Sequence, residues 1–490
     1  MADQLNPSNG GGRGASPSPP TARKRTSALL FLFLFSAALV AFHAGAQAAE
    51  EQFIAVRAGK LIVGNGEEKE NVTVLLRDGK VDTIGDNVEL PFPCEVIDAS
   101  DKTVMPGLIH PESRLGLLPF SINGQRAERR VLDEFMPDEE AYETALKAGF
   151  TTIVLSPPAS NGVGGRALAI RSKDMGGGWI VDDDGYLLVN LRRPGPDKPV
   201  IKGALKAAEQ EIEKRKKAKE EWEKKKKEAE EAAKKAAEEA AKKAEEAKKP
   251  QTGQPPQPPP AAQEPPKPAP PEPQPQPPPQ PGAPAQPAPV EEFKPPEVPA
   301  NLKTWVDLLD KKEGVIALAH LGGAATYLHY REAIKGFEFR YVLEGDTGAD
   351  FFGVADIYLV AKELALNKEL VLVVPQISQI PYSSDRNNIP RVLVEAGARV
   401  AFRPASDSPE SMEGLRFQTA EVIKGGLDRK EALKALGVHA AEVVGLQDRL
   451  GSIEKGKDGN LLILSGDPFD LQTQVDQVLI EGKVAWRRED

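Results

Sequence analysis

Residues 104–117 read VMPGLIHPESRLGL, and this stretch decides how the rest of the chain is interpreted. Its apolar beginning is typical of a buried β-strand, and polar side chains follow at His110, Glu112 and Arg114. Side chains two positions apart on a strand point to the same side. Glu112 and Arg114 are therefore expected to project together, a carboxylate beside a cation. His110 is expected to pack rather than to bind a ligand.

Both ends of the chain predict short β segments. Strands are expected at residues 53–58 and 72–76, followed by a hairpin turn at Asp78-Gly79. Matching strands are expected at residues 460–464 and 478–486. Neither pair of strands is large enough to bury a core alone. We therefore expect the two ends, residues 49–103 and 448–490, to form one small composite β-sandwich.

Between these ends, strand and helix patterns alternate. An amphipathic helix is expected at residues 138–149, ending at Gly149, and a buried strand follows at residues 151–155. The alternation continues between residues 315 and 403. Such alternation is typical of parallel strands joined by helical crossovers, and it places the chain in the α/β class.

Residues 201–300 interrupt this alternation. The first half consists almost entirely of Lys, Glu and Ala, with Glu and Lys often four positions apart, as in a solvated helix. A lone charged helix is favoured over a coiled-coil dimer, because no apolar heptad stripe is sustained. The second half is rich in Pro, Gln and Ala and is expected to be extended or disordered. The insert is expected to be a spacer, with binding of another protein as the alternative.

Composition narrows the classes of function. The 490 residues carry a net charge of −10, which argues against nucleic acid as a partner, because phosphate binding needs a basic surface. Cys94 is the only cysteine, so neither an internal disulfide nor a zinc–thiolate site can form.

The N-terminal residues 1–48 have the order of a secretory signal. A long polar leader precedes a basic cluster at residues 23–25, an apolar run, and a small-residue pattern at residues 46–48. We therefore expect an exported, periplasmic or otherwise extracytoplasmic protein. An uncleaved N-terminal membrane anchor is the alternative, and it would also export the folded part.

Further motifs carry a resemblance to a known family: AGFTT at residues 148–152, NGVGGR at 161–166, RLGSIEKGKDGN at 449–460 and SGDP at 465–468. Together with residues 104–117, they resemble the amidohydrolase superfamily, in particular its secreted imidazolonepropionase-like branch. The resemblance implies a (β/α)8 TIM-like barrel over residues 104–200 and 301–447, beside the β-sandwich. It also implies hydrolysis of C–N bonds outside peptides, such as those of cyclic amides, by a metal-activated water.

The resemblance implies the positions of the site residues as well. In this superfamily the strand at residues 104–117 ends in two histidine ligands, and this chain has Glu112 and Arg114 in their places. His320 stands at the end of a later strand, in the position of a further ligand, and Glu344 occupies the next ligand position. Asp407 has the position of the catalytic aspartate, which is also a metal ligand.

Two arrangements of these residues remain open. In the first, Glu112, Glu344 and Asp407 bind a divalent cation with His320, and Mn²⁺ or Mg²⁺ suits them better than the zinc expected from the family. In the second, Arg114 forms an ion pair with Glu112 or Glu344 and opposes a metal, because a guanidinium cannot be deprotonated.

The second arrangement is favoured. It predicts a catalytically impaired protein that binds a small amide-type substrate or ligand and no cofactor. The alternatives are an active hydrolase with a carboxylate-rich metal site and a non-catalytic binding or scaffold protein of the cell envelope.

Overall fold

The computed structural model describes residues 51–117, 126–158, 162–246, 292–345, 355–380 and 383–489. All elements named below belong to one compact unit, Gln52–Asp490. The predicted signal and most of the Pro-rich segment lie outside the described residues. Within the described part of the chain, no helix is both long enough and apolar enough to cross a membrane.

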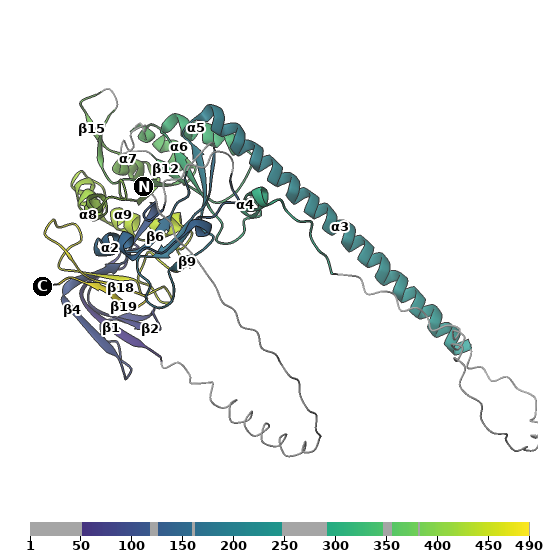
Figure 1. Cartoon of the computed structure of the whole chain (residues 1–490), viewed down its shortest axis with the longest axis horizontal. Coiled ribbons are helices and arrows are strands. Elements are labelled where there is room, and N and C mark those ends of the chain that lie inside the picture. Colours follow the sequence, from purple (N-terminus) through teal and green to yellow (C-terminus); the bar gives the residue numbers. More distant parts are fainter. Residues whose placement is uncertain are drawn as a thin grey trace, which may run out of the picture. The chain divides into compact units, whose positions relative to one another are not determined.

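One sheet of seven strands joins the two ends of this unit (Figure 1). Its strands lie in the order β19-β18-β17-β4-β1-β2-β3. Their bounds are β1 (Phe53–Ile62), β2 (Glu68–Arg77), β3 (Lys80–Gly85), β4 (Glu95–Pro106), β17 (Leu461–Leu464), β18 (Val475–Ile480) and β19 (Lys483–Arg487). Strand β4 is parallel to β1 and antiparallel to β17, so segments from both ends pair directly. Their arrangement as a two-layer sandwich stays a prediction.

The hairpin between β2 and β3 is confirmed. Asp78 and Gly79 both have positive φ angles, 50° and 79°. This is the conformation that a two-residue turn between antiparallel strands requires. The turn between β18 and β19 has the same character, with φ angles of 47° at Glu481 and 77° at Gly482.

Two further sheets form the middle of the chain. The six-stranded sheet has the order β16-β13-β12-β11-β10-β7 and the four-stranded sheet the order β5-β6-β8-β9. Their bounds are β5 (Leu108–Ser113), β6 (Phe150–Leu155), β7 (Val163–Arg166), β8 (Leu168–Arg171), β9 (Ile180–Asp182), β10 (Leu187–Leu191), β11 (Ala317–Leu321), β12 (Tyr341–Gly345), β13 (Leu370–Val373) and β16 (Arg399–Phe402). A small separate pair consists of β14 (Ile377–Gln379) and β15 (Arg386–Asn388).

The strand directions bear out a mixed α/β fold. Strands β10, β11, β12, β13 and β16 are parallel, as are β5 and β6, whereas β7 is antiparallel to β10. The hydrogen-bonded pairs among the described strands form two sheets, not one closed ring. The complete (β/α)8 barrel therefore stays a prediction.

The helices follow the strands along the chain. They are α2 (Glu139–Lys147), α3 (Pro194–Glu246), α4 (Ala300–Leu309), α5 (Ala324–Ala333), α6 (Ala361–Leu366), α7 (Ile389–Ala396), α8 (Pro409–Lys424), α9 (Arg429–Leu436) and α10 (Val438–Val443), with short 3₁₀ turns η1 (Val131–Glu134) and η2 (Ile357–Val360). Local chemistry sets their ends: the Asp138 side chain accepts from the Ala141 N–H at the start of α2, and Gly149, with φ 100°, follows its end.

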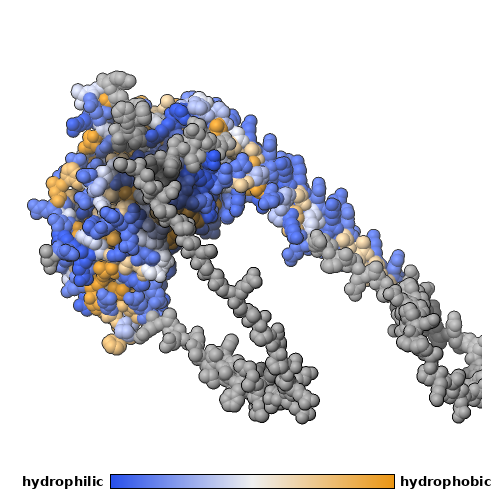
Figure 2. Space-filling view, viewed as in Figure 1, coloured by the Kyte–Doolittle hydropathy of each residue, from blue (hydrophilic) through white to orange (hydrophobic). Residues whose placement is uncertain are grey.

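Helix α3 begins at Pro194, before the predicted insert. Ile201, Leu205 and Ala208 are fully buried, so the first turns belong to the core, contrary to the expected spacer. No described side chain of α3 beyond Ala208 is buried, and this length is mostly hydrophilic (Figure 2). The chain returns beside the helix, where the rings of Phe293 and Trp222 lie 5.6 Å apart. The helix is therefore anchored at one end and solvated along the rest.

Gly107 links the terminal sheet to the four-stranded sheet. It lies between β4 and β5, and its N–H donates to the Asn460 carbonyl at 2.9 Å. A Cβ atom at this position would lie only 2.2 Å from the hydroxyl oxygen of Thr151. The glycine is required because β6 passes too close for any side chain.

Strand alternation then positions the site. Leu188, Leu318, Val342 and Ala401 belong to one buried cluster, to which Val154 of the four-stranded sheet also belongs. Side chains two positions further along each strand face the same way. The carboxyl ends of these parallel strands therefore direct polar side chains to one common side.

Candidate functional site

Neighbouring strands place three polar side chains in one row. In the parallel register, Asn190 of β10 pairs with His320 of β11, which pairs with Glu344 of β12. All three residues are buried. Directly paired residues of adjacent strands have their side chains in contact range. The row therefore brings an amide, an imidazole and a carboxylate together.

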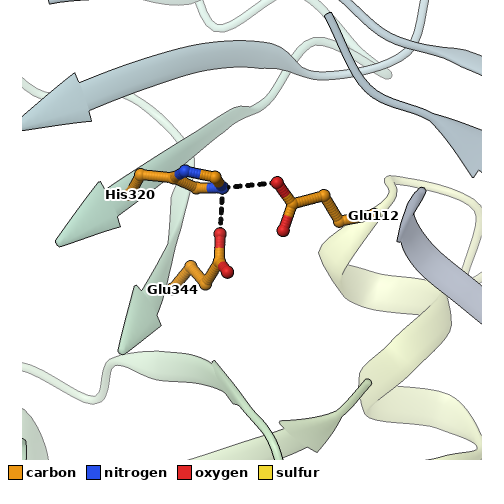
Figure 3. A group of neighbouring side chains, drawn as sticks. All are labelled: Glu112, His320 and Glu344. Carbon is orange, nitrogen blue, oxygen red and sulfur yellow. Dashed lines mark ion pairs between the residues drawn. The ribbon is translucent and has the colours of Figure 1, made fainter. Parts of the chain in front are cut away.

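The imidazole of His320 lies between two carboxylates (Figure 3). Its Nε2 atom is 2.7 Å from Glu112 Oε1 and also contacts Glu344 Oε2. Glu112 comes from β5, so this contact joins the ends of the two sheets. The structure thus brings together three of the predicted site residues.

Arg403 supplies the cation of this cluster. It follows β16 directly, its Nη2 lies 2.7 Å from Glu344 Oε1, and its Nε lies 3.8 Å from Glu112 Oε2. The expected ion pair of Arg114 with either glutamate is absent from the ion pairs among described residues. Instead, Arg114 Nη1 donates to the Ser156 carbonyl at 3.2 Å. The pairing predicted for Arg114 is therefore wrong, and Arg403 is the cation of the cluster that sequence reasoning missed.

Asp407 lies in the same cavity but has other partners. Its Oδ1 accepts from the Ser113 hydroxyl at 2.7 Å, and its Oδ2 accepts from the Arg114 backbone N–H at 2.8 Å. His110 Nε2 lies 3.1 Å from Oδ1, and the His110 ring packs on Phe150. His110 therefore packs as expected, and it also helps to hold the carboxylate that was predicted to be catalytic.

The charges within the cluster perturb its titration. Burial disfavours the imidazolium of His320, but Glu112 and Glu344 outweigh burial and raise its pKa to about 10. Burial also opposes the ionised form of Glu344, yet His320 and Arg403 hold its pKa well below the ordinary value. For Asp407, the contacts with His110 and Ser113 overcome burial and lower the pKa. The raised pKa of His320 favours its imidazolium form, which then faces Glu344 together with the Arg403 guanidinium.

These residues line a cavity of about 420 Å³. Its wall is polar and includes Asn190, Arg192, Ser156 and Ser406 beside the charged cluster. Ligand pockets have volumes of roughly 300–1,000 Å³. The cavity is therefore large enough for a small molecule with several hydrogen-bonding groups.

A divalent metal can be tested against this geometry. Glu112, His320 and Glu344 each offer a ligand atom, and these atoms lie within 4.8 Å of one another. Asp407, the fourth predicted ligand, is not in this group. A carboxylate and imidazole set suits a divalent cation in composition. As arranged, however, it does not fit one, because the Arg403 guanidinium lies 2.7 Å from Glu344 Oε1 and places a fixed positive charge beside the two carboxylates.

Sequence comparison assigns the family. The profile of the amidohydrolase family matches residues 139–485, most of the described unit. The chain belongs to the amidohydrolase family. No curated protein matches it.

Solved structures support the fold. An amidohydrolase from Thermotoga maritima MSB8 is 24% identical, with a TM-score of 0.59, over 89% of this chain and all of that one. A Xaa-Pro dipeptidase with bound methionine is 15% identical, with a TM-score of 0.44, and covers 89% of this chain and 100% of its own. Molinate hydrolase is also 15% identical, with a TM-score of 0.44, over 89% and 95%. The first likeness shows that this amidohydrolase-family chain shares the mixed α/β fold of solved members.

Proposed function

We propose that this protein binds a small amide-type molecule in the cavity at the strand ends, and that its hydrolysis of C–N bonds is impaired. Family membership supports the substrate class: amides outside peptides, such as cyclic amides, as in the imidazolonepropionase-like branch that the sequence motifs resemble. The observation that carries the proposal is the position of the His320 imidazole: its Nε2 atom lies between the carboxylates of Glu112 and Glu344 within the cavity.

The impairment follows from how the polar atoms are used. Hydrolysis of an amide requires an activated water and a group that accepts its proton. The His320 nitrogen that would bind a metal or accept a proton lies within ion-pair distance of two carboxylates. Both oxygens of Asp407, the expected catalytic residue, already accept hydrogen bonds. The cavity therefore retains groups that can orient an amide, while the groups that would activate water are engaged with each other.

Binding and turnover can be measured separately. We expect some members of a panel of cyclic and linear amides to raise the thermal midpoint of the chain, without turnover when Zn²⁺ or Mn²⁺ is added. Asn190→Leu, within the cavity, should abolish the shift. Asn387→Leu, in β15 and outside the cavity lining, should preserve it. Steady hydrolysis of any panel member by the metal-supplemented native chain would overturn the impairment, and an unchanged shift in Asn190→Leu would overturn the assigned cavity.

The same proposal places the protein outside the cytoplasm. The order of basic, apolar and small residues within residues 1–48 supports export. Fractionation of cells that express the whole chain, and a version that begins at residue 49, tests this. Recovery of both versions in the cytoplasm would contradict export.

A further inference from the structure

Arg403 holds a central place in the charged cluster. Its side chain is only 12% exposed, and it contacts Glu344 at 2.7 Å while approaching Glu112 at 3.8 Å. Its backbone is fixed as well, because its N–H donates to the carbonyl of Val373, the last residue of β13, at 3.1 Å. The guanidinium is therefore held beside the same two carboxylates that face His320.

A guanidinium in this place competes directly with a divalent cation. The two carboxylates and the imidazole are the kinds of ligand that Mn²⁺ accepts, and their ligand atoms lie within 4.8 Å of one another. An arginine remains charged at any pH that a folded protein tolerates. A cation brought to these oxygens would meet that positive charge within a few ångströms, in a buried setting where screening is weak.

We propose that Arg403 is an internal counterion that excludes divalent cations, and that Glu112, His320 and Glu344 form a latent divalent-cation site that opens when the charge at position 403 is removed. The inference rests on the proposed impairment of hydrolysis, and it names a residue that contributes to this impairment by excluding a metal. Arg403 is thus a positioning residue: by pairing with the two carboxylates, it keeps an external cation from binding them.

The test uses the full mature chain, purified without chelator and titrated with MnCl₂ alone. Bound Mn²⁺ is measured by equilibrium dialysis with elemental mass spectrometry. We expect Arg403→Met to bind about one Mn²⁺ per chain, at least about 100-fold more tightly than the native chain, because one like charge near the ion has been removed. Arg403→Lys, which keeps the charge, should behave like the native chain.

Arg399→Met is the matched control. Arg399 is the first residue of β16, four positions before Arg403, and its guanidinium pairs with Glu442 at 2.7 Å, outside the cluster. This variant should bind Mn²⁺ as weakly as the native chain. Equal affinity of the native chain and Arg403→Met, or a similar gain in Arg399→Met, would overturn the inference.

Loss of Arg403 leaves the buried Glu344 and the partly buried Glu112 with His320 as their one partner in the cluster, so a second variant guards against misfolding. Glu112→His/Arg403→Met removes one of the like charges and should also gain one Mn²⁺. Both variants are refolded with and without Mn²⁺, and their secondary structure is followed by circular dichroism. A folded variant that binds no Mn²⁺ overturns the inference, and so does failure of both to fold with Mn²⁺ present. If the native chain binds no Mn²⁺ and the variants gain none, this inference fails while the proposed function stands.

Discussion

Glu344→Gln tests the charged cluster most directly. Glu344 is 3% exposed and contacts both His320 and Arg403, the latter at 2.7 Å. Glutamine keeps the shape of the side chain but removes its charge, so the buried His320 and the partly buried Arg403 then face Glu112 alone. Removing one partner of a buried ion pair typically costs about 3–5 kcal/mol, because the other charge is left uncompensated. We expect the free energy of unfolding to fall by about this amount.

The assay is urea denaturation followed by circular dichroism, with two comparisons. Glu442→Gln breaks the pair with Arg399, whose side chains are 42% and 30% exposed for Arg399 and Glu442, so it should cost no more than about 1 kcal/mol. Glu344→Gln/Arg403→Met restores the balance of one cation to one carboxylate and should be less destabilising than Glu344→Gln alone. A loss below about 1 kcal/mol for Glu344→Gln would refute the argument that the cluster is held by charge balance.

Three further predictions concern pH, close packing and the insert. Folding raises the pKa of His320 to about 10, so its contribution to stability is complete below about pH 6.5 and is lost as the pH rises toward 10. The unfolding free energies of the native chain and His320→Gln should therefore converge as the pH rises from about 6.5 to about 10. Burial lowers the pKa of His439, so the native chain and His439→Gln should converge in the opposite direction, as the pH falls below about 6.5. Gly107→Ala should lower the free energy of unfolding by about 1–3 kcal/mol, because the added methyl group overpacks the contact with Thr151. Gly414→Ala, in α8 with no atom near its Cβ position, should instead raise it by up to about 1 kcal/mol. Urea denaturation measures both changes. Leu205→Ala should cost about 2–5 kcal/mol, because this side chain of α3 is fully buried, and a loss below 0.5 kcal/mol would contradict the packing of the first turns of α3.

Local sequence signals were sufficient for much of the fold. The Asp78-Gly79 turn was predictable because its φ angles depend on the two residues themselves. Helix α2 was predictable because Asp138 caps its start and Gly149 follows its end. The buried start of α3 was also detectable in principle. Ile201, Leu205 and Ala208 recur at helical spacing, and the highly charged composition that follows obscured this signal.

Partner choice within the site was not predictable from local signals. Alternation along one strand suggested that Arg114 shares a face with Glu112, but β5 ends at Ser113. The backbone then turns so that the Arg114 N–H reaches Asp407, and the alternation no longer applies. Arg403 was recognisable as a residue at the end of a strand, yet its contact with Glu344 depends on how β16 lies relative to β12. That relation is set by tertiary packing across β13, which no single-strand pattern encodes.

The balance of charge also determines how metal binding could be restored. Histidines at positions 112 and 114 would match the pattern of the superfamily, but Glu112→His/Arg114→His alone removes a carboxylate and leaves Arg403 in place. Glu344 would then face Arg403 and His320 with no other carboxylate of the cluster beside it, so an added cation would still meet a fixed positive charge. We therefore expect Glu112→His/Arg114→His to bind no Zn²⁺ or Mn²⁺, and the addition of Arg403→Met to restore about one metal per chain. Metal content measured by mass spectrometry decides between the two: binding by the double variant would show that the histidine positions, and not Arg403, control the site.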